Sequence, residues 1–346
     1  KNVLFHKELG SIYQKIKRMQ KISSTICEIL KTDKSTSEKA DRAIYLCKSD
    51  LETAMVNEFA SLQGHMGKIY AIEDGEDPEV AEAIEQHYRP KFSGDVMPTN
   101  MVSIIASIAE KIDNIIGSYS VGNIPKGSQD PYALRRQAHA VVEMLIKNDI
   151  NICLNTLLKS IADQYKEGYS LIEPILEFFS ARAKTIYSDN GFRYDEIDAC
   201  LSTNNADYLE LFRRAQSIHN YRENPHFSEM LLSFKRMNNI VSAFRKSNSD
   251  YALHFSNDLL KETEEKELFN FFNSQTEAIK NHINNSSYVE LFDLLIEGKS
   301  IIDNFFDKVL VMDEDTSIRD NRLYILESIL SNFTKLLDFS KISDKE

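Results

Sequence analysis

The sequence predicts an all-α protein made of two or three helical domains. Glycine and proline, which interrupt helices, number only 11 and 7 in 346 residues. Apolar residues recur at spacings of three and four along most of the chain, which is the period of an amphipathic helix. A chain of this length normally divides into more than one domain, so each domain is expected to bury its own core.

The first domain is predicted to span residues 1–150 and to consist of amphipathic helices. The pattern predicts helices over 7–31, over 37–62 with Ser37 near its start, and over 100–117. A shorter helix between the second and third is expected to stop at Arg89-Pro90, because the residue before a proline disfavours the helical conformation.

The rest of the chain is predicted to form a helical linker, 151–224, and a C-terminal helical bundle, 225–346. The apolar pattern loosens from residue 151, and Asn224-Pro225 marks the second boundary. The long helices expected beyond that boundary cover 226–247, 256–284, 287–312 and 318–340. Several long helices in succession are typical of a bundle.

Composition narrows the class of protein. Charged residues make up 27 % and apolar residues 42 %, and no apolar run approaches the roughly 18 residues of a membrane span. The net charge of −12 argues against a nonspecific coat on nucleic acid, although a local basic face is compatible with it. The four cysteines lack the spacing of zinc ligands, and nothing suggests secretion, so we expect reduced thiols in a cytoplasmic protein. Without an initiator methionine, the chain is expected to begin within a longer protein.

The stretch from Gly122 to Arg136 is the most specific local signal. Two of the chain's glycines and two of its prolines fall within these fifteen residues. Asp130 and Pro131 are predicted to be the N-cap and first residue of a helix that runs to about residue 147. Lys126, Arg135 and Arg136 would then surround a helix N-terminus, which favours an anion such as phosphate. The alternative is a well-capped helix start with a surface arginine pair.

A second polar group lies near the C-terminus, after the apolar run from Phe305 to Met312. Arg319 and Arg322 share one helix face with Asn321 beside them, and Lys308 lies nearby in the sequence. Two arginines and an amide could hold a phosphate or the edge of a base. The alternative is ion pairing of the arginines with the acidic turn Asp313-Glu314-Asp315.

Signals for catalysis are weak. No histidine is followed by aspartate, and His6, His65, His87 and His139 lack the spacing of metal ligands, so no metal site is predicted. Asp50, Ala54 and Asn57 lie along one face of a predicted helix, and an ordinary amphipathic helix with an acidic face explains them better than a polar site does. No nucleotide-binding loop occurs. We therefore predict no catalytic residue and no cofactor in this segment.

The order of these motifs closely resembles the C-terminal half of the β subunit of bacterial glycyl-tRNA synthetase, the two-subunit type. The resemblance spans nearly the whole chain and is most specific at 125–136 and 303–323. One departure is Ala109-Glu110-Lys111, where the family usually has Ala-Asp-Lys. The matching blocks include Lys48 to Met55, Leu62-Gln63-Gly64, Tyr88-Arg89-Pro90, Lys111-Ile112-Asp113, Pro125-Lys126-Gly127, Asp130 to Arg136, Phe305 to Met312 and Asn321-Arg322-Leu323.

The resemblance implies a layout and a role. The first domain looks like an HD-type helical domain without metal ligands, and the C-terminal bundle resembles the anticodon-binding domain of arginyl-tRNA synthetase. In this family the α subunit activates glycine with ATP and magnesium, and two α and two β subunits form a heterotetramer. This segment would then support binding of tRNA(Gly). The residues we expect to contact tRNA or to shape its binding surface are Lys126, Arg135, Arg136, Lys308, Arg319, Asn321 and Arg322.

Two other functions compete with this one. The first is a metal-dependent HD phosphohydrolase, which would require a bound divalent metal. The second is a purely structural module that holds a larger assembly together. The acidic stretch 71–85, which would repel RNA, is the feature that most favours it.

Overall fold

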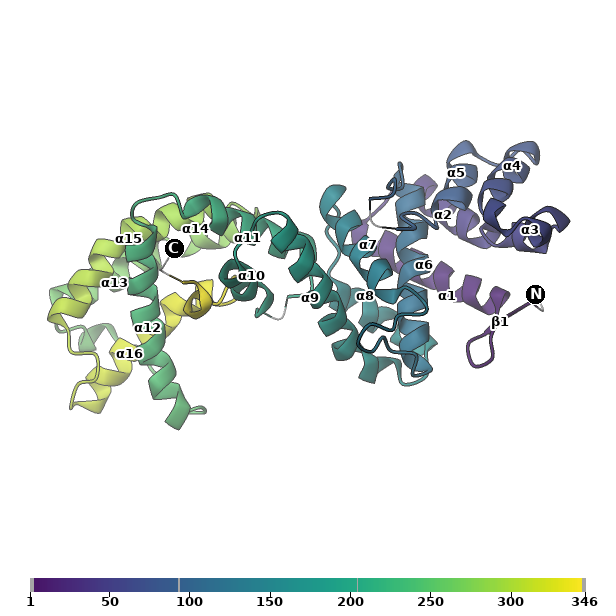
Figure 1. Ribbon diagram of the computed structural model, residues 1–346. Helices are drawn as coiled ribbons and strands as arrows, with labels where there is room; N and C mark the ends of the chain where they lie inside the picture. The colour runs from purple at the N-terminus through teal and green to yellow at the C-terminus, as the bar shows by residue number, and fades with distance from the viewer. Residues whose placement is uncertain (1–2, 93, 204, 344–346) are drawn as a thin grey trace. The chain divides into compact units, whose positions relative to one another are not determined.

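The computed structural model describes residues 3–92, 94–203 and 205–343. These residues form sixteen α-helices and one two-stranded hairpin, so the predicted all-α class is confirmed (Figure 1). They divide into an N-terminal unit, up to Ile186 together with Ala206–Leu209, and a C-terminal unit, Tyr187–Asn205 together with the chain from Glu210. The region predicted as a linker, 151–224, is thus divided between the two units. In the described part of the chain, no helix has the length and apolar character needed to cross a membrane.

The N-terminal unit is a helical assembly preceded by the hairpin. Its elements are β1 (Leu4–His6), β2 (Gly10–Ser11), α1 (Ile12–Leu30), α2 (Lys34–Leu46), η1 (Ser49–Glu52), α3 (Ala54–Glu58), η2 (Ala60–Leu62), α4 (His65–Glu73), α5 (Pro78–Gln86), α6 (Met101–Ser120), α7 (Leu134–Lys147), α8 (Leu154–Ile161), η3 (Ala162–Gln164), η4 (Gly168–Leu171) and the greater part of α9 (Ile172–Asp189).

Helix α6 is the centre of this unit. It packs against α1, α2, α5 and α7, and its apolar residues from Val102 to Ile116 are buried. Asn100 caps it, because its side chain accepts a hydrogen bond from the backbone N–H of Ser103 at 2.8 Å. Being surrounded on several sides, α6 carries buried charged residues as well as apolar ones, and these build the polar interior described below.

The first helix begins later than its periodicity predicts. It was expected from residue 7, but residues 4–11 form the hairpin and α1 begins at Ile12. Ser11 and Gln14 form a capping box, in which each side chain accepts a hydrogen bond from the backbone N–H of the other. Gly10 has a φ of +83°, which favours glycine and lets the chain leave the hairpin directly into this cap.

The helix predicted over 37–62 is wrong at both ends. It begins at Lys34, because Asp33 caps it by accepting from the Thr36 N–H at 3.0 Å, and it ends at Leu46. Short turns follow, and the buried carboxylate of Asp50 accepts a hydrogen bond from the Gly64 N–H at 2.6 Å. The polar face expected from Asp50, Ala54 and Asn57 therefore does not form on one helix.

The start of α7 differs from the prediction in position but not in its capping residue. The helix begins at Leu134, and Ala133 adopts a left-handed conformation with a φ of +54°. Asp130 and Pro131 thus lie outside the helix. The Asp130 carboxylate reaches over Ala133 and accepts hydrogen bonds from the N–H groups of Leu134, at 2.8 Å, and Arg135, at 2.9 Å.

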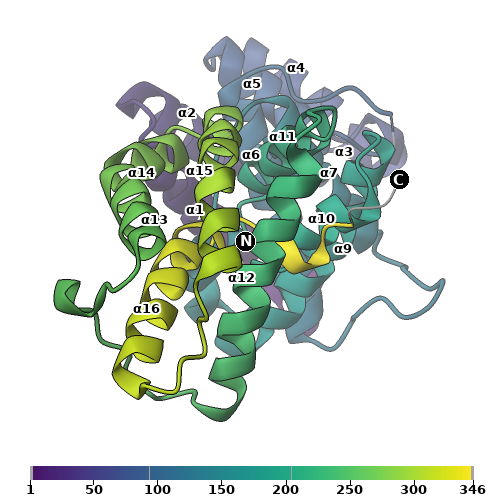
Figure 2. The same ribbon diagram turned by 90° about the vertical axis from the view of Figure 1, so that its left-hand side faces the viewer.

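The C-terminal unit is a helical bundle in which α15 and α16 both pack against α12 (Figure 2). Phe234, Phe305 and Phe333, one from each of these helices, are fully buried in its core. The elements are the end of α9, α10 (Tyr194–Leu201), α11 (Tyr208–Tyr221), α12 (Phe227–Ser247), η5 (Asn257–Leu259), α13 (Thr263–Ser274), α14 (Thr276–Asn284), α15 (Tyr288–Lys308), α16 (Thr316–Phe333) and η6 (Phe339–Lys341).

Two long helices predicted here are shorter or broken. The span 256–284 contains α13 and α14 and begins with a turn, because the Glu265 carboxylate accepts from the N–H groups of Lys261 and Glu262 and starts α13 at Thr263. The span 318–340 is α16, which starts at Thr316 and ends at Phe333. The chain then turns back, and Phe339 is buried beside Phe234.

Candidate functional site

Three arginines converge on a cavity of about 200 Å³ in the N-terminal unit, which we call the arginine cavity. Arg135 and Arg136 come from the first turn of α7, and Arg182 comes from α9. The remaining lining residues are Pro90, Phe92, His139, Ala140, Glu143 and Thr185. The α7 residues that line it recur at spacings of three and four, so the cavity follows one face of this helix from its first turn to Glu143.

The arginine cavity carries excess positive charge. None of its three arginines forms an ion pair with a carboxylate of the described residues, and the buried Nε atom of Arg182 has no hydrogen-bond partner there. Its acidic residue, Glu143, is already paired with Lys147 at 2.6 Å. Guanidinium groups repel one another unless an anion lies between them, and their forked donors fit phosphate oxygens. The arrangement therefore suits a phosphate group.

The phosphate-binding role predicted for the helix N-terminus itself does not fit. The Asp130 carboxylate already occupies the first free N–H groups, so any anion must be bound by side chains. Lys126 is exposed in the preceding turn and does not line the cavity. The buried carboxylate of Asp113 contacts Lys15 and Arg18 and forms no ion pair with Arg135 or Arg136.

Asn321 and Arg322 are interior residues of the C-terminal unit. The Arg322 side chain is 6 % exposed, forms an ion pair through Nε with Glu265 and through Nη1 with Asp313 at 2.8 Å, and donates to the Leu310 carbonyl. Asn321 accepts a hydrogen bond from the Ser256 N–H at 2.7 Å. For Arg322, the structure shows the ion pairing with the acidic turn that the sequence left open as an alternative. Asn321 and Arg322 are both buried and stabilise the bundle through these interior contacts.

Arg319 and Lys308 are accessible but have acidic neighbours. Arg319 contacts Asp320 at 2.8 Å and lies over the Phe244 ring, with 5.6 Å between the guanidinium carbon and the ring centre. Lys308 is exposed and pairs with Glu264 at 2.6 Å. Exposed ion pairs contribute little to stability and exchange readily for other partners.

An aromatic surface beside Arg319 was missed by the sequence analysis. The rings of Phe255 and Phe269 stack with centres 4.3 Å apart, and Tyr324 lies 5.6 Å from Phe255. Tyr324 is 37 % exposed, and one turn before it on α16 Asp320 accepts a hydrogen bond from the exposed Tyr251 hydroxyl. We call Tyr251, Phe255, Phe269 and Tyr324 the aromatic platform. Aromatic residues at helical spacing are usually core, so the pattern alone did not distinguish it.

A buried network of charges fills the interior of the N-terminal unit. Lys48 lies 3.1 Å from Glu110 and 2.9 Å from the Nε2 atom of His87. Burial opposes ionisation of both members of the ion pair, but Lys15 and Lys48 lower the pKa of Glu110 below its usual range, and Glu110 raises that of Lys48. Burial and Lys48 lower the pKa of His87 well below its usual value. His87 is thus neutral, accepting from Lys48 through Nε2 and donating through Nδ1 to the Ile84 carbonyl at 2.8 Å.

This network does not favour the alternative function, a metal-dependent HD phosphohydrolase. Lysine ammonium groups occupy the space between the histidine and the carboxylates, and the Nε2 lone pair that would bind a metal accepts from Lys48. Among residues 3–92, 94–203 and 205–343, no group of three His, Cys, Asp or Glu side chains could hold a metal ion.

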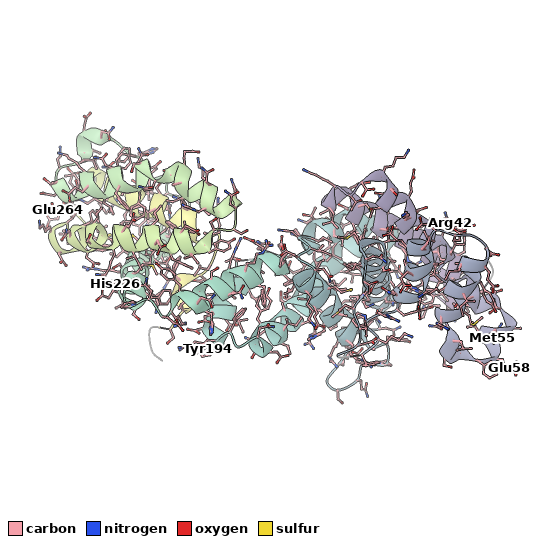
Figure 3. The ribbon with its side chains drawn as sticks, turned by 90° about the horizontal axis from the view of Figure 1, so that it is seen from above. Arg42, Met55, Glu58, Tyr194, His226 and Glu264 are labelled. Atoms are coloured by element: carbon pink, nitrogen blue, oxygen red, sulfur yellow. The ribbon has the colours of Figure 1, made fainter. Side chains whose placement is uncertain are left out.

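Most carboxylates of the acidic stretch 71–85 form ion pairs within the unit, although they outnumber the cations that pair with them. Arg42 (Figure 3) pairs with Glu76 at 2.5 Å, and Lys39 pairs with Asp77 at 3.1 Å. Lys68 contacts the carboxylates of Glu82 and Glu85. The feature that most favoured a purely structural module is therefore in large part a set of intramolecular ion pairs.

Comparison with known proteins agrees with this two-part architecture. Residues 230–344, most of the C-terminal bundle, match the DALR anticodon binding domain, and residues 1–202 match the glycyl-tRNA synthetase beta subunit. An anticodon-binding helical bundle that follows a region matching a glycyl-tRNA synthetase subunit defines a subunit of the aminoacyl-tRNA synthetase class. The chain belongs to the glycyl-tRNA synthetase beta subunit family, as the motifs in the sequence indicated.

Curated relatives are similar over nearly the whole chain. The glycine–tRNA ligase beta subunit of Clostridioides difficile is 37 % identical over 348 residues, covering 99 % of this chain and 49 % of the relative. Those of Syntrophomonas wolfei and Desulforamulus reducens are 37 % and 35 % identical, covering 99 % and 98 % of this chain and 49 % of each relative. The chain spans about half the length of the curated relatives it matches. The HD-type character expected for the N-terminal unit stays a prediction.

Proposed function

We propose that this chain is the tRNA-binding portion of the beta subunit of a glycine–tRNA ligase, and that it supports ATP-dependent attachment of glycine to tRNA(Gly). The observation that carries the proposal is the match of the C-terminal bundle to an anticodon binding domain, together with the aromatic platform on that bundle. Unpaired bases of an RNA loop stack on exposed aromatic side chains.

The partners in this proposal follow from the family. An alpha subunit would carry the adenylation site and use ATP and magnesium, while this segment contributes no catalytic residue and no cofactor of its own. A cytoplasmic heterotetramer of two alpha and two beta subunits is the assembly we propose. The names of the relatives, each a beta subunit of glycine–tRNA ligase, support an alpha partner.

The two candidate sites would bind different parts of RNA. On the C-terminal unit, the aromatic platform would stack anticodon bases while Arg319 and Lys308 contact the neighbouring backbone. On the N-terminal unit, Arg135, Arg136 and Arg182 would bind phosphate, with Lys126 in the adjoining turn. Sequence-tolerant stacking and charge-driven phosphate binding give distinct signatures in binding experiments.

Replacing Tyr324 with alanine is expected to weaken tRNA(Gly) binding roughly 5- to 150-fold, because loss of one stacked base costs about 1–3 kcal/mol. The measurement is tRNA affinity at fixed salt, made on the intact protein with its accompanying subunits. Tyr194→Ala is the matched control, since Tyr194 (Figure 3) is 71 % exposed and outside the platform. Equal affinities for the two variants would remove the platform from the interface.

Replacing Arg135 and Arg136 with alanine is expected to weaken tRNA binding at low salt and to reduce the slope of log affinity against log salt by about 1 for each phosphate that is no longer bound. The slope separates direct phosphate binding from a general loss of fold, which would abolish binding at every salt concentration. Lys34→Ala, which removes a 90 % exposed cation from α2, is the control. An unchanged slope in the double variant would contradict phosphate binding by these arginines.

A further inference from the structure

A second cavity, of about 370 Å³, lies on the other side of Arg136. It shares only Pro90 and Arg136 with the arginine cavity. We call it the Lys111 cavity, because α6 contributes Lys111 and Glu110 to its inner wall. The other lining residues are Ala60, Ser61, Gln63, Tyr88, Lys91, Asn114, Ala133 and Gln137.

Lys111 is a buried amine that, when protonated, has no paired carboxylate among the described residues. Lys111 is only 3 % exposed. Its Nζ atom donates to the Arg89 carbonyl at 2.7 Å and to the Ser107 hydroxyl at 2.8 Å. An ammonium group has three N–H donors, so one is left over. No ion pair with a described carboxylate is formed. Burying an ammonium group without an opposite charge is costly, so such a group favours the binding of an anion.

The rest of the lining supplies more positive charge. Lys91 and Arg136 are exposed at the cavity and form no ion pair with the described acidic residues. The carboxylate in the wall, Glu110, is already paired with Lys15 at 3.5 Å and Lys48 at 3.1 Å. Amide and hydroxyl groups make up much of the remaining polar lining. The cavity thus presents three cations against one carboxylate that other lysines neutralise.

We propose that the Lys111 cavity binds a phosphate group, carried by a free nucleotide or by RNA, with Lys111 as the buried counterion and Lys91 and Arg136 at the mouth. The volume accommodates a phosphate together with part of the sugar or base attached to it. This site is separate from the aromatic platform and needs no tRNA for its test, so the proposal stands or fails apart from the tRNA-binding function.

The burial of Lys111 also couples the binding of an anion to the protonation of this side chain. Burial lowers its pKa from 10.5 to about 7; Glu110 and Asp95 oppose the shift and Lys48 adds to it. The other groups facing it are the neutral His87 and the cavity cations Lys91 and Arg136. At pH 8 the free protein therefore holds Lys111 mostly neutral. A bound anion favours the ammonium form, so binding takes up a proton at this pH, whereas at pH 6 Lys111 is already protonated and takes up none.

Sulfate is the probe for this test, because its charge stays constant over this pH range while that of phosphate does not. Calorimetric titration of the intact protein, in two buffers of different ionisation enthalpy, is expected to show uptake approaching one proton at about pH 8 and close to none at about pH 6. Affinity should fall up to about tenfold per pH unit above pH 7.

Four variants identify the cavity. Lys111→Met should abolish the proton uptake, and Lys91→Gln, at a residue that lines the Lys111 cavity alone of the two, should weaken sulfate binding several-fold while keeping it. Arg182→Gln, which lines only the arginine cavity, and Lys34→Gln, at an exposed site on α2, should leave the uptake unchanged. Because Lys91 is exposed and lines this cavity but not the arginine cavity, its variant keeps the test decisive even where Lys111→Met does not fold.

Competition then identifies the source of the phosphate. Displacement of sulfate by adenosine monophosphate indicates a free nucleotide, and displacement by tRNA alone indicates the RNA backbone. The proposal is overturned if sulfate does not bind, if it binds at pH 8 without proton uptake, if Lys91→Gln has no effect, or if neither competitor displaces it.

Discussion

Replacing Asp113 with alanine is expected to lower the free energy of unfolding of the N-terminal unit by about 3–5 kcal/mol. The Asp113 carboxylate is fully buried and accepts hydrogen bonds from Lys15 at 2.8 Å, Arg18 at 2.7 Å and the Tyr165 hydroxyl at 2.8 Å. Burial and this carboxylate raise the pKa of Tyr165 well above its usual value, so the phenol remains a donor. Alanine would leave Arg18 without its carboxylate partner and Lys15 with Glu110 alone, at 3.5 Å.

Urea unfolding followed by circular dichroism measures this effect. Asp163→Ala removes an exposed carboxylate from the same unit and should change little. Asp113→Asn keeps the shape and part of the hydrogen bonding, so it should fall between the two. A loss below about 1 kcal/mol for Asp113→Ala would show that water or other groups satisfy Lys15 and Arg18 equally well.

Replacing Arg322 with alanine is expected to cost the C-terminal unit about 3–5 kcal/mol for the same physical reason. Glu265 is buried beside Arg322 and would lose this ion pair, which leaves its carboxylate with the backbone N–H groups of Lys261 and Glu262. The change also frees the Leu310 carbonyl and Asp313, which hold the connection between α15 and α16. Part of the loss is packing, because the Arg322 stem is buried with its head group.

Lys308→Ala is the control for this prediction, since its pair with Glu264 is exposed and should be replaced by water with no resolved change in stability. Unfolding of the C-terminal unit and tRNA affinity should be measured together. A variant of Arg322 that unfolds normally yet loses tRNA binding would contradict the interior role and restore a direct contact with RNA.

Several helices were predictable from apolar residues that recur at spacings of three and four. The periods of 100–117 and 287–312 correspond closely to α6 and α15. The predicted N-cap of α7 was wrong by three residues, although the Asp130 carboxylate still accepts from the first free N–H groups of that helix. The predicted helix boundaries were wrong where a capping side chain, and not the apolar periodicity, sets the start of the helix. Ser11 delays α1 and Asp33 advances α2, because a side chain that satisfies free N–H groups sets the start of a helix.

The candidate sites were predictable only in part. Arg135 and Arg136 were identified from their place at a helix start, but their companion Arg182 is distant in the sequence and has no local signal. Arg322 resembled a binding residue until the structure placed Glu265 against it. In the sequence, Lys111 looks like a charged residue on the solvent-facing side of an amphipathic helix. The residues around it in the sequence do not show that other helices cover this side of α6 as well.

The sequence by itself determined the helical class, most of the helices and the family, because these depend on local periodicity and on short specific motifs. The tertiary structure alone decided which charges are interior and which are free to bind. Lys15 and Asp113 are 98 residues apart, and Arg322 and Glu265 are 57 apart. Whether a charge is paired depends on such long-range contacts, and these arise only when helices distant in the sequence pack together.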